Sequence, residues 1–293
     1  MPGYMKPQYY EFIPVDGTRR VAVSKEVFTT RNRFDHIALL NLSLEAKSEL
    51  HVGSGMKSIE RVGRRLLPIL EALRDSSGMP YIPGSTLKGV MSTNYLALSG
   101  SIEEVSECFG TSQARSNCYG PLVSKLFFSN AVPESEVKPI YREVRMAWQP
   151  NIRRSRHVKI YTSKAPQTAP YGKMECIPRG TRLKTSIVGI NLRDYELGGI
   201  LMALGLAYVG GKVEARPLKV GYGKPQGFGS LQVDPDRSTL DEREIALLTL
   251  RGVETSKLSS PDCAELIKVF AEEGGRRGRD VSNIWRKIFK TLD

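Results

Sequence analysis

Cysteine and histidine are scarce in this chain. Its 293 residues include four cysteines, at positions 108, 118, 176 and 263, and three histidines. No two cysteines form a CxxC pair, and no histidine stands at the spacing of a zinc site, so we expect no metal site of that kind. A disulfide framework is not expected in a chain of this size inside a cell, and the cysteines are predicted to be scattered, buried thiols.

Long apolar runs are also missing. No run approaches the roughly 18 to 20 residues that span a bilayer, and residues 1–6 lack the apolar centre of a signal peptide. We therefore expect a soluble, cytoplasmic protein without a membrane partner. The motif GxxxxGK[ST] is absent, which excludes nucleotide hydrolysis of the P-loop type. Hydrophobic residues make up 40% and charged residues 25% of the chain, the composition of an ordinary globular protein.

Positive charge is in excess. The net charge is +12, which favours a polyanionic partner. Most of the excess lies in residues 142–184, where eleven lysines and arginines stand against two glutamates. Trp148, Tyr161 and Tyr171 are interleaved with these cations, a mixture that is typical of RNA binding.

The periodicity of the apolar residues predicts an α+β protein. The expected elements are a strand at 37–50, helices at 86–99 and 102–108, strands at 122–128 and 181–189, a helix at 195–209 and a strand at 229–233. This order is that of a ferredoxin-like (RRM-like) fold. The expected division is an N-terminal arm at 1–35, the ferredoxin-like domain at 36–235 and a helical extension at 236–293. Within the domain, residues 56–77 are expected to form a partly helical insertion and residues 145–177 a basic, protruding β-hairpin.

The segment from Gly78 to Val90 has the pattern of a phosphate site. A turn, a short apolar strand and a glycine-containing loop lead into a predicted helix. The first N–H groups of a helix and its dipole attract anions. Lys88 adds a full charge there, and Ser85 and Thr86 either cap the helix or hydrogen-bond the ligand.

Several motifs follow one another in a characteristic order. They are Tyr9–Val15, Tyr81–Val90 (YIPGSTLKGV), Cys108–Gly110 with Tyr119–Ala131, and the glycine-rich segment Gly221–Gly229 (GYGKPQGFG). Together they resemble the RAMP superfamily, the RNA-binding subunits of CRISPR effector complexes, and its type III branch in particular. Asn130 stands where that family usually has aspartate.

The resemblance implies a guide-RNA-binding subunit that works in antiviral defence beside target RNA and other effector subunits, without a cofactor. It implies contacts to RNA from Ser85, Thr86 and Lys88, and from the glycine-rich loop at Gly221, Gly223, Lys224 and Gly227. The hairpin at 145–177 would be the family's thumb. Its phosphate contacts would come from Arg153, Arg154, Arg156, His157 and Lys159, with Ile160 or Met174 as a wedge between bases. Because it is basic, contains prolines and lacks a helical apolar stripe, the segment 153–170 of this hairpin is expected to contribute little to the core.

Catalysis depends on an aspartate that the cleaving relatives carry between a His-Val-Gly turn and the IPGS loop. The weak candidates in this chain are Glu71 and Asp75, and Asp75 is also explained as a turn residue. We therefore expect no catalytic residue, and Mg²⁺ or Mn²⁺ only if the protein does cut RNA. His51, in the His-Val-Gly turn, is interpreted as structural. The alternatives that stay open are a RAMP-type endoribonuclease for target or precursor RNA and a general basic RNA-binding protein.

Overall fold

A central antiparallel sheet organises the molecule. The computed structural model describes residues 10–16, 35–111, 122–147, 156–161, 167–246 and 249–290. The sheet has the strand order β13–β14–β2–β10–β5, with neighbours antiparallel. Its strands are β2 (His36–Ala46), β5 (Leu126–Phe128), β10 (Arg182–Ile190), β13 (Leu218–Lys219) and β14 (Ser230–Val233), and the short β6 (Val132–Pro133) also pairs with β10. The strands predicted at 37–50, 181–189 and 229–233 are thus present, and the one at 122–128 is shorter than expected.

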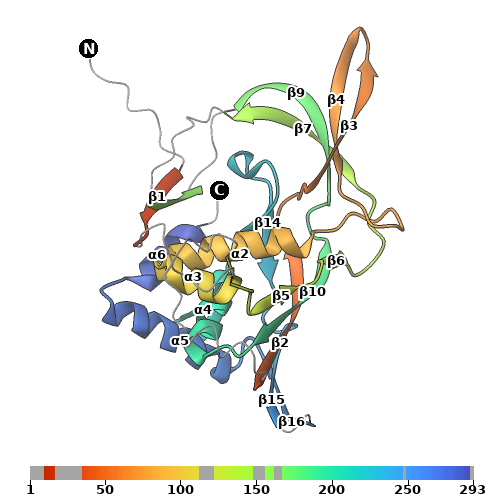
Figure 1. The fold of residues 1–293 in the computed structure, drawn as a ribbon. Coiled ribbons are helices and arrows are strands. Elements are labelled where there is room, and N and C mark those ends of the chain that lie inside the picture. Colours follow the sequence, from red (N-terminus) through yellow and green to blue (C-terminus); the bar gives the residue numbers. More distant parts are fainter. Residues whose placement is uncertain are drawn as a thin grey trace, which may run out of the picture.

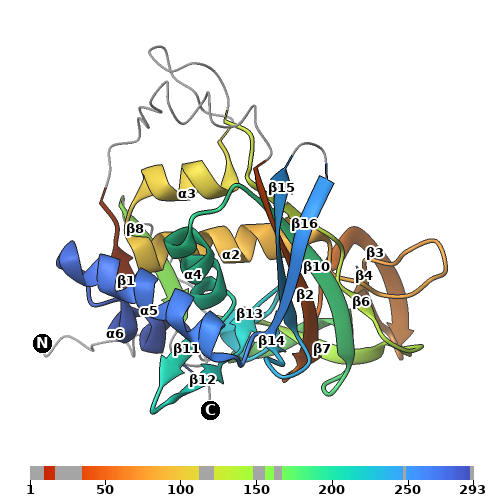
Figure 2. The same cartoon turned by 90° about the horizontal axis from the view of Figure 1, so that it is seen from below.

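The helices gather on one side of this sheet (Figures 1 and 2). They are α2 (Gly84–Ser99), α3 (Ile102–Phe109), α4 (Asp194–Ala203), α5 (Pro261–Arg276) and α6 (Val281–Ile288). Along the chain the sheet and its helices follow the order β2–α2–β5–β10–α4–β14. Within the described residues, no helix is long and apolar enough to cross a membrane.

The core lies between the sheet and these helices. Alternate residues of β2 face it, and Ala38, Leu40 and Leu44 are almost completely buried. The α4 helix packs tightly on α5, because a Cβ atom at Gly198 would lie only 2.0 Å from the backbone oxygen of Leu266. Only glycine permits this approach of the two helices.

A second sheet stands beside the first and projects away from the helices (Figure 1). Its order is β3–β4–β9–β7, built from β3 (Gly53–Val62), β4 (Arg65–Ala72), β7 (Ile140–Ala147) and β9 (Gln167–Cys176). The expectation of a partly helical insertion at 56–77 is therefore wrong, since β3 and β4 form a hairpin. Pro68 lies in the middle of the stretch expected to be helical, where its ring and missing N–H oppose an α-helix.

The basic segment between β7 and β9 is partly a core element. Its strand β8 (His157–Tyr161) pairs with β1 (Tyr10–Pro14), and Val158 and Ile160 belong to the main hydrophobic core. The expectation that residues 153–170 add little to the core is wrong, because Val158 and Ile160, alternate residues of β8, are apolar and buried. Ile160 and Met174 are both buried, so neither reaches a base as a wedge.

The C-terminal part begins with strands. Residues 239–257, expected to be helical, form the hairpin of β15 (Thr239–Ala246) and β16 (Thr249–Lys257), and β15 pairs with β2. The helix predicted at 195–209 ends at Ala203, because Gly205 adopts a φ of +89°. The chain continues into a hairpin of β11 (Leu206–Val209) and β12 (Lys212–Ala215). The division at 35 and 235 stays a prediction.

Candidate RNA-binding surface

Loops that lie far apart in the sequence meet at the base of β3 (Figure 1). The backbone N–H of Tyr222, in the glycine-rich loop, donates to the carbonyl oxygen of His51 over 2.9 Å. The N–H of Leu73 donates to Val52 over 2.8 Å, and the N–H of Tyr81 donates to Leu73 over 3.3 Å. Backbone hydrogen bonds therefore join the His-Val-Gly turn, the glycine-rich loop and the loop that precedes α2.

The first turn of α2 leaves a backbone donor available. The side-chain oxygen of Asn130 accepts from the N–H of Gly84 over 3.0 Å, and the N-cap residue, Pro83, supplies no side-chain cap. A Cβ atom at Gly84 would lie 2.3 Å from the backbone oxygen of Phe128, so only glycine fits there. The N–H of Ser85 has no hydrogen-bond partner within the described residues. An anion placed at this helix start finds an oriented donor.

Lys88 lies one turn into the same helix. Burial lowers the pKa of this half-buried lysine, and no carboxylate in the described part of the chain forms an ion pair with it. The exposed Ser85 and the half-buried Thr86 precede it with their hydroxyl groups. Ser85, Thr86 and Lys88 therefore lie together at one helix end, and they supply a charge and hydroxyl donors suited to a phosphate.

The glycine-rich loop holds a second unpaired cation. Gly221 and Gly223 both have a φ of +76°, and a Cβ atom at Gly221 would lie 2.2 Å from the backbone oxygen of His51. Gly227, with a φ of +94°, closes the short 3-10 turn that contains Lys224. Burial lowers the pKa of the Lys224 ammonium, which pairs with no carboxylate among the residues described. A buried cation without a counter-ion is stabilised by an incoming anion.

The remaining predicted contacts lie elsewhere. The predicted contacts at Arg156, His157 and Lys159 lie in β8 or next to it, and β8 pairs with β1. Arg279 donates both to Pro14 of β1 and to Leu98 at the C-terminal end of α2, so β8 lies near that end of the helix. Lys159 places its ammonium 4.1 Å from the ring centroid of Tyr10. The 16 residues of α2 span about 24 Å, so β8 and the start of α2 are separate places. Arg153 and Arg154 lie outside the described residues.

The two acidic candidates do not form a catalytic cluster. One carboxylate oxygen of Asp75 accepts from the N–H groups of Ser77 and Met79, both over 2.9 Å, and from the Ser77 hydroxyl over 2.6 Å. These bonds lower the pKa of Asp75 and account for it as a turn residue. Glu71 is half-buried on β4. Among the residues that the structure describes, no group of three or more metal-binding side chains occurs.

Sequence reasoning missed Glu175, which joins β9 to the end of β4 and to β7 within the second sheet. This buried carboxylate accepts from the N–H of Ala72 over 3.0 Å, from Arg74 over 3.0 Å and from the Tyr141 hydroxyl over 3.2 Å. Its backbone oxygen lies 2.6 Å from His51 Nδ1, which therefore carries the proton. Burial lowers the pKa of His51, so the ring is neutral and structural, as predicted. The sequence contained one signal for this role, because Glu175 stands between the apolar residues Met174 and Cys176 near the end of a strand.

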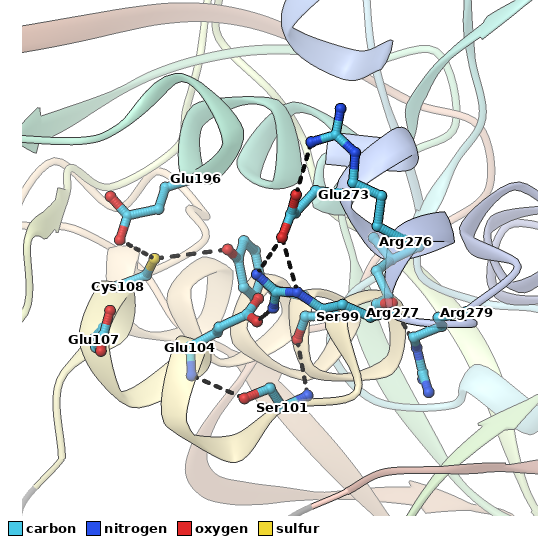
Figure 3. Close-up of polar contacts among 12 residues, drawn as sticks. Ser99, Ser101, Glu104, Glu107, Cys108, Glu196, Glu273, Arg276, Arg277 and Arg279 are labelled. Atoms are coloured by element: carbon cyan, nitrogen blue, oxygen red, sulfur yellow. Dashed lines mark hydrogen bonds and ion pairs between the residues drawn. The ribbon is translucent and has the colours of Figure 1, made fainter. Parts of the chain in front are cut away.

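A second polar cluster joins α3, α4 and α5 (Figure 3). Lys125 bonds both carboxylate oxygens of Glu196 over 2.8 Å, and Cys108 Sγ lies 3.6 Å from one of them. Burial alone would raise the pKa of Glu196, but Lys125 and Arg193 lower it below its ordinary value. Burial raises the pKa of Cys108, so its thiol is not a nucleophile at neutral pH. Cys108, Cys176 and Cys263 are free and buried, as predicted for scattered thiols.

The neighbouring charges are paired as well. Arg277 lies between Glu104 and Glu273 and bonds both of them (Figure 3). The cavity beside α3, of about 460 Å³, is lined by such acids and arginines. This region is therefore a structural network that ties the C-terminal helices to α3.

Comparison with known proteins yields a family. The family model of the RAMP superfamily matches residues 43–232, a span that covers more than half of the chain and runs from β2 into β14. It contains the His-Val-Gly turn, the start of α2 and the glycine-rich loop. No curated protein matches the chain. RAMP proteins are CRISPR-associated, and the match supports a general CRISPR-related role in RNA binding together with other subunits. The chain belongs to the RAMP superfamily.

Proposed function

We propose that this chain is a guide-RNA-binding structural subunit of a type III CRISPR effector complex. The observation that carries the proposal is the meeting of the family's motif loops at one place. The helix that follows one of these loops carries Lys88, and another of the loops carries Lys224; both lysines are half-buried and have no ion-pair partner within the described residues. Contacts of this type bind the sugar–phosphate backbone, while base pairing between guide and target reads the sequence.

The core is proposed to be ferredoxin-like. The strand order β14–β2–β10–β5 and the chain order β2–α2–β5–β10–α4–β14 support this assignment. The arms of the proposed thumb are β7 and β9, which pair with each other.

The β3–β4 hairpin offers apolar contacts that Ile160 and Met174 cannot make. Ile59 and Leu66 are 69% and 66% exposed. The register pairs Ile59 with Pro68 and Arg61 with Leu66, so these residues share one face of the hairpin. A strand pair with exposed apolar side chains beside a cation is suited to a base step flanked by phosphates. We place the apolar contact to the guide–target duplex on this hairpin.

The subunit is proposed not to cut RNA by itself. Divalent-metal cleavage needs carboxylates held near the scissile phosphate. The turn bonds of Asp75 argue against that role. With the assembled complex, labelled target RNA and Mg²⁺ or Mn²⁺, neither Glu71→Ala nor Asp75→Ala should remove a cut. Loss of one specific cut with assembly intact would establish the endoribonuclease alternative.

The test of the proposal is the RNA that co-purifies with the chain, which should be short and uniform at its 5′ end. Lys88→Ala should weaken guide binding by about 1–2 kcal/mol, the size of one charge-assisted phosphate contact. The slope of log affinity against log salt should fall by about 1. Lys212→Ala, which removes an exposed lysine of β12, is the matched control. A folded Lys88→Ala protein with unchanged affinity and slope contradicts the proposal.

A further inference from the structure

The face of the central sheet that turns away from α2 and α4 carries a polar and aromatic pattern. The helices cover the other face (Figure 2), where Leu183 and Ile187 of β10 are fully buried. The alternate residues of β10, Lys184 and Ser186, point to the open face. The register places Lys184 opposite Ser43 and Ser186 opposite Asn41 of β2.

A groove of about 430 Å³ lies at this place. It is lined by hydroxyl, amide and cationic side chains, namely Asn41, Ser43, Ser129, Lys184, Ser186 and Arg237. Glu134 is the only acid among its described lining residues. Its carboxylate is 3.6 Å from Arg237, and both side chains are substantially exposed, so this ion pair is weak. The groove therefore favours an anionic ligand that can replace Glu134 as the ion-pair partner of Arg237.

The floor of the groove has an unmet hydrogen bond. Ser43 is only 7% exposed, and its hydroxyl oxygen has no hydrogen-bond partner among the described residues. A buried hydroxyl without a partner is unfavourable, because the group has lost its bonds to water. Lys184 beside it forms no ion pair with the described carboxylates. Both groups are satisfied by a ligand that carries an anion and a hydroxyl close together.

An exposed aromatic ring stands next to the groove. Phe127 of β5 is 50% exposed and pairs with Val188 of β10. Because its neighbours Leu126 and Phe128 turn toward the core, Phe127 points to the open face. Val188 is two residues along the strand from Ser186, a distance of about 6.8 Å. Lys184 lies four residues along β10 from Val188, about 14 Å away, so a base on Phe127 and a phosphate at Lys184 belong to neighbouring nucleotides of one strand.

We infer that this open face binds single-stranded RNA, with a base stacked on Phe127, a phosphate at Lys184 and Arg237, and the ribose hydroxyl over Ser43. The charge, the hydroxyl-rich floor and the aromatic ring together match a short single strand of RNA. The groove extends to Asn130, which bonds the first turn of α2, but Phe127 and Lys184 lie on the face of the sheet opposite to Lys88, so the two sets of residues can be tested apart. The inference shares only its ligand class, RNA, with the proposed function.

The test uses a short fluorescein-labelled oligouridylate and its deoxy counterpart with the purified full chain. Phe127→Ile keeps a strand-forming apolar residue but removes the ring, and it should weaken RNA binding by about tenfold, as expected for one lost base stack. Phe127→Tyr should bind like the original protein. Lys184→Ala should lower the salt slope by about 0.7, the value for one phosphate of a single strand. The deoxy oligonucleotide should bind more weakly than the RNA, and Lys212→Ala should change nothing.

Ultraviolet crosslinking of the bound RNA followed by mass spectrometry supplies a direct readout, and the adduct should fall on the peptide that contains Phe127. Oligouridylate binding that is equal for Phe127→Ile, Lys184→Ala and the original protein overturns the inference, as does capture of a protein subunit but no RNA by this face. Measuring the guide RNA that co-purifies with each variant distinguishes the proposed function from this second RNA site. Loss of guide in Lys88→Ala with normal oligouridylate binding in Phe127→Ile leaves the proposed function and removes this site. Normal guide binding in Lys88→Ala with weakened oligouridylate binding in Phe127→Ile supports this site and contradicts the proposed function.

Discussion

Replacing Glu175 tests how β4 and β7 are held to β9 within the second sheet. Its two carboxylate oxygens receive different donors. One accepts from the buried backbone N–H of Ala72, and the other accepts from Arg74 and Tyr141. Alanine at position 175 removes all three bonds. Glutamine keeps one oxygen, which can stay on Ala72 while its amide group turns toward Arg74 and Tyr141.

The expected magnitudes follow from exposure. Ala72 is 6% exposed, and Glu175→Ala removes the carboxylate that accepts from its backbone N–H. Leaving this buried N–H unpaired should lower the free energy of unfolding by about 1–3 kcal/mol. Tyr141 is 52% exposed and the Arg74 side chain 36%, so water replaces the lost acceptor and each bond contributes about 0–1 kcal/mol. Glu175→Ala should therefore lower the free energy of unfolding by about 2–3 kcal/mol, and Glu175→Gln by about 1 kcal/mol or less.

Urea unfolding followed by circular dichroism measures both values, and limited proteolysis reports whether β3 and β4 are released first. Glu143→Ala and Glu143→Gln are the controls, because the Glu143 side chain is 57% exposed and, in the described part of the chain, forms its ion pair with Arg145 alone. They should change the free energy of unfolding by less than about 0.5 kcal/mol. Equal, large losses for the alanine and glutamine variants of Glu175 would show that its charge, and not the bond to Ala72, holds the sheet. Losses no larger than those of the Glu143 controls would refute the reasoning altogether.

Other substitutions probe the helix start, the ion pair and β8. Gly84→Ala should displace the first turn of α2, because its Cβ atom would meet the backbone oxygen of Phe128 at 2.3 Å, and guide binding should fall with the melting temperature. Lys125→Met should cost about 3 kcal/mol in urea unfolding, because it removes one partner of the buried Glu196 carboxylate. Acid titration of the original protein should show the Glu196 contribution complete above the ordinary glutamate pKa of about 4.3. That contribution is lost as pH falls through the lowered pKa of Glu196 in the folded state. Lys125→Met should reduce the dependence of the free energy of unfolding on pH in this range. Ile160→Ala should leave a cavity in the core and lower the free energy of unfolding by about 2–5 kcal/mol. A loss below about 0.5 kcal/mol would show that β8 does not contribute to the core.

The sequence predicted the elements whose apolar periodicity is long and regular. The strand at 37–50 alternates cleanly, and the helix at 86–99 repeats buried residues at Leu87, Met91, Tyr95 and Leu98. Both are present close to their expected bounds. The free, buried cysteines and the structural His51 also followed from residue type and spacing.

The errors have a common physical cause. At 56–77, at 239–257 and in β8, the strands contain several charged residues, four of them consecutive in β15 from Asp241 to Glu244. A strand of that composition resembles a solvated loop or helix until its partner is known. The partner of β8 is β1, and the partner of β15 is β2. Such pairings join residues more than a hundred positions apart and leave no local signal. For the candidate surface, the motifs indicated which residues to examine, but the separation of Lys159 from Lys88 depends on the register of β8 with β1.

The pairing of β15 with β2 also bears on where the chain can be shortened. The family match ends in β14, which covers β2 only at Leu44, Glu45 and Ala46. The rest of that side, from His36 to Asn41, is covered by β15. A chain cut after Pro235 would keep the whole matched span and yet expose a row of unpaired backbone groups along the central strand. An uncovered edge of that kind recruits strands from other molecules, so the shortened protein should aggregate even though every motif residue is still present.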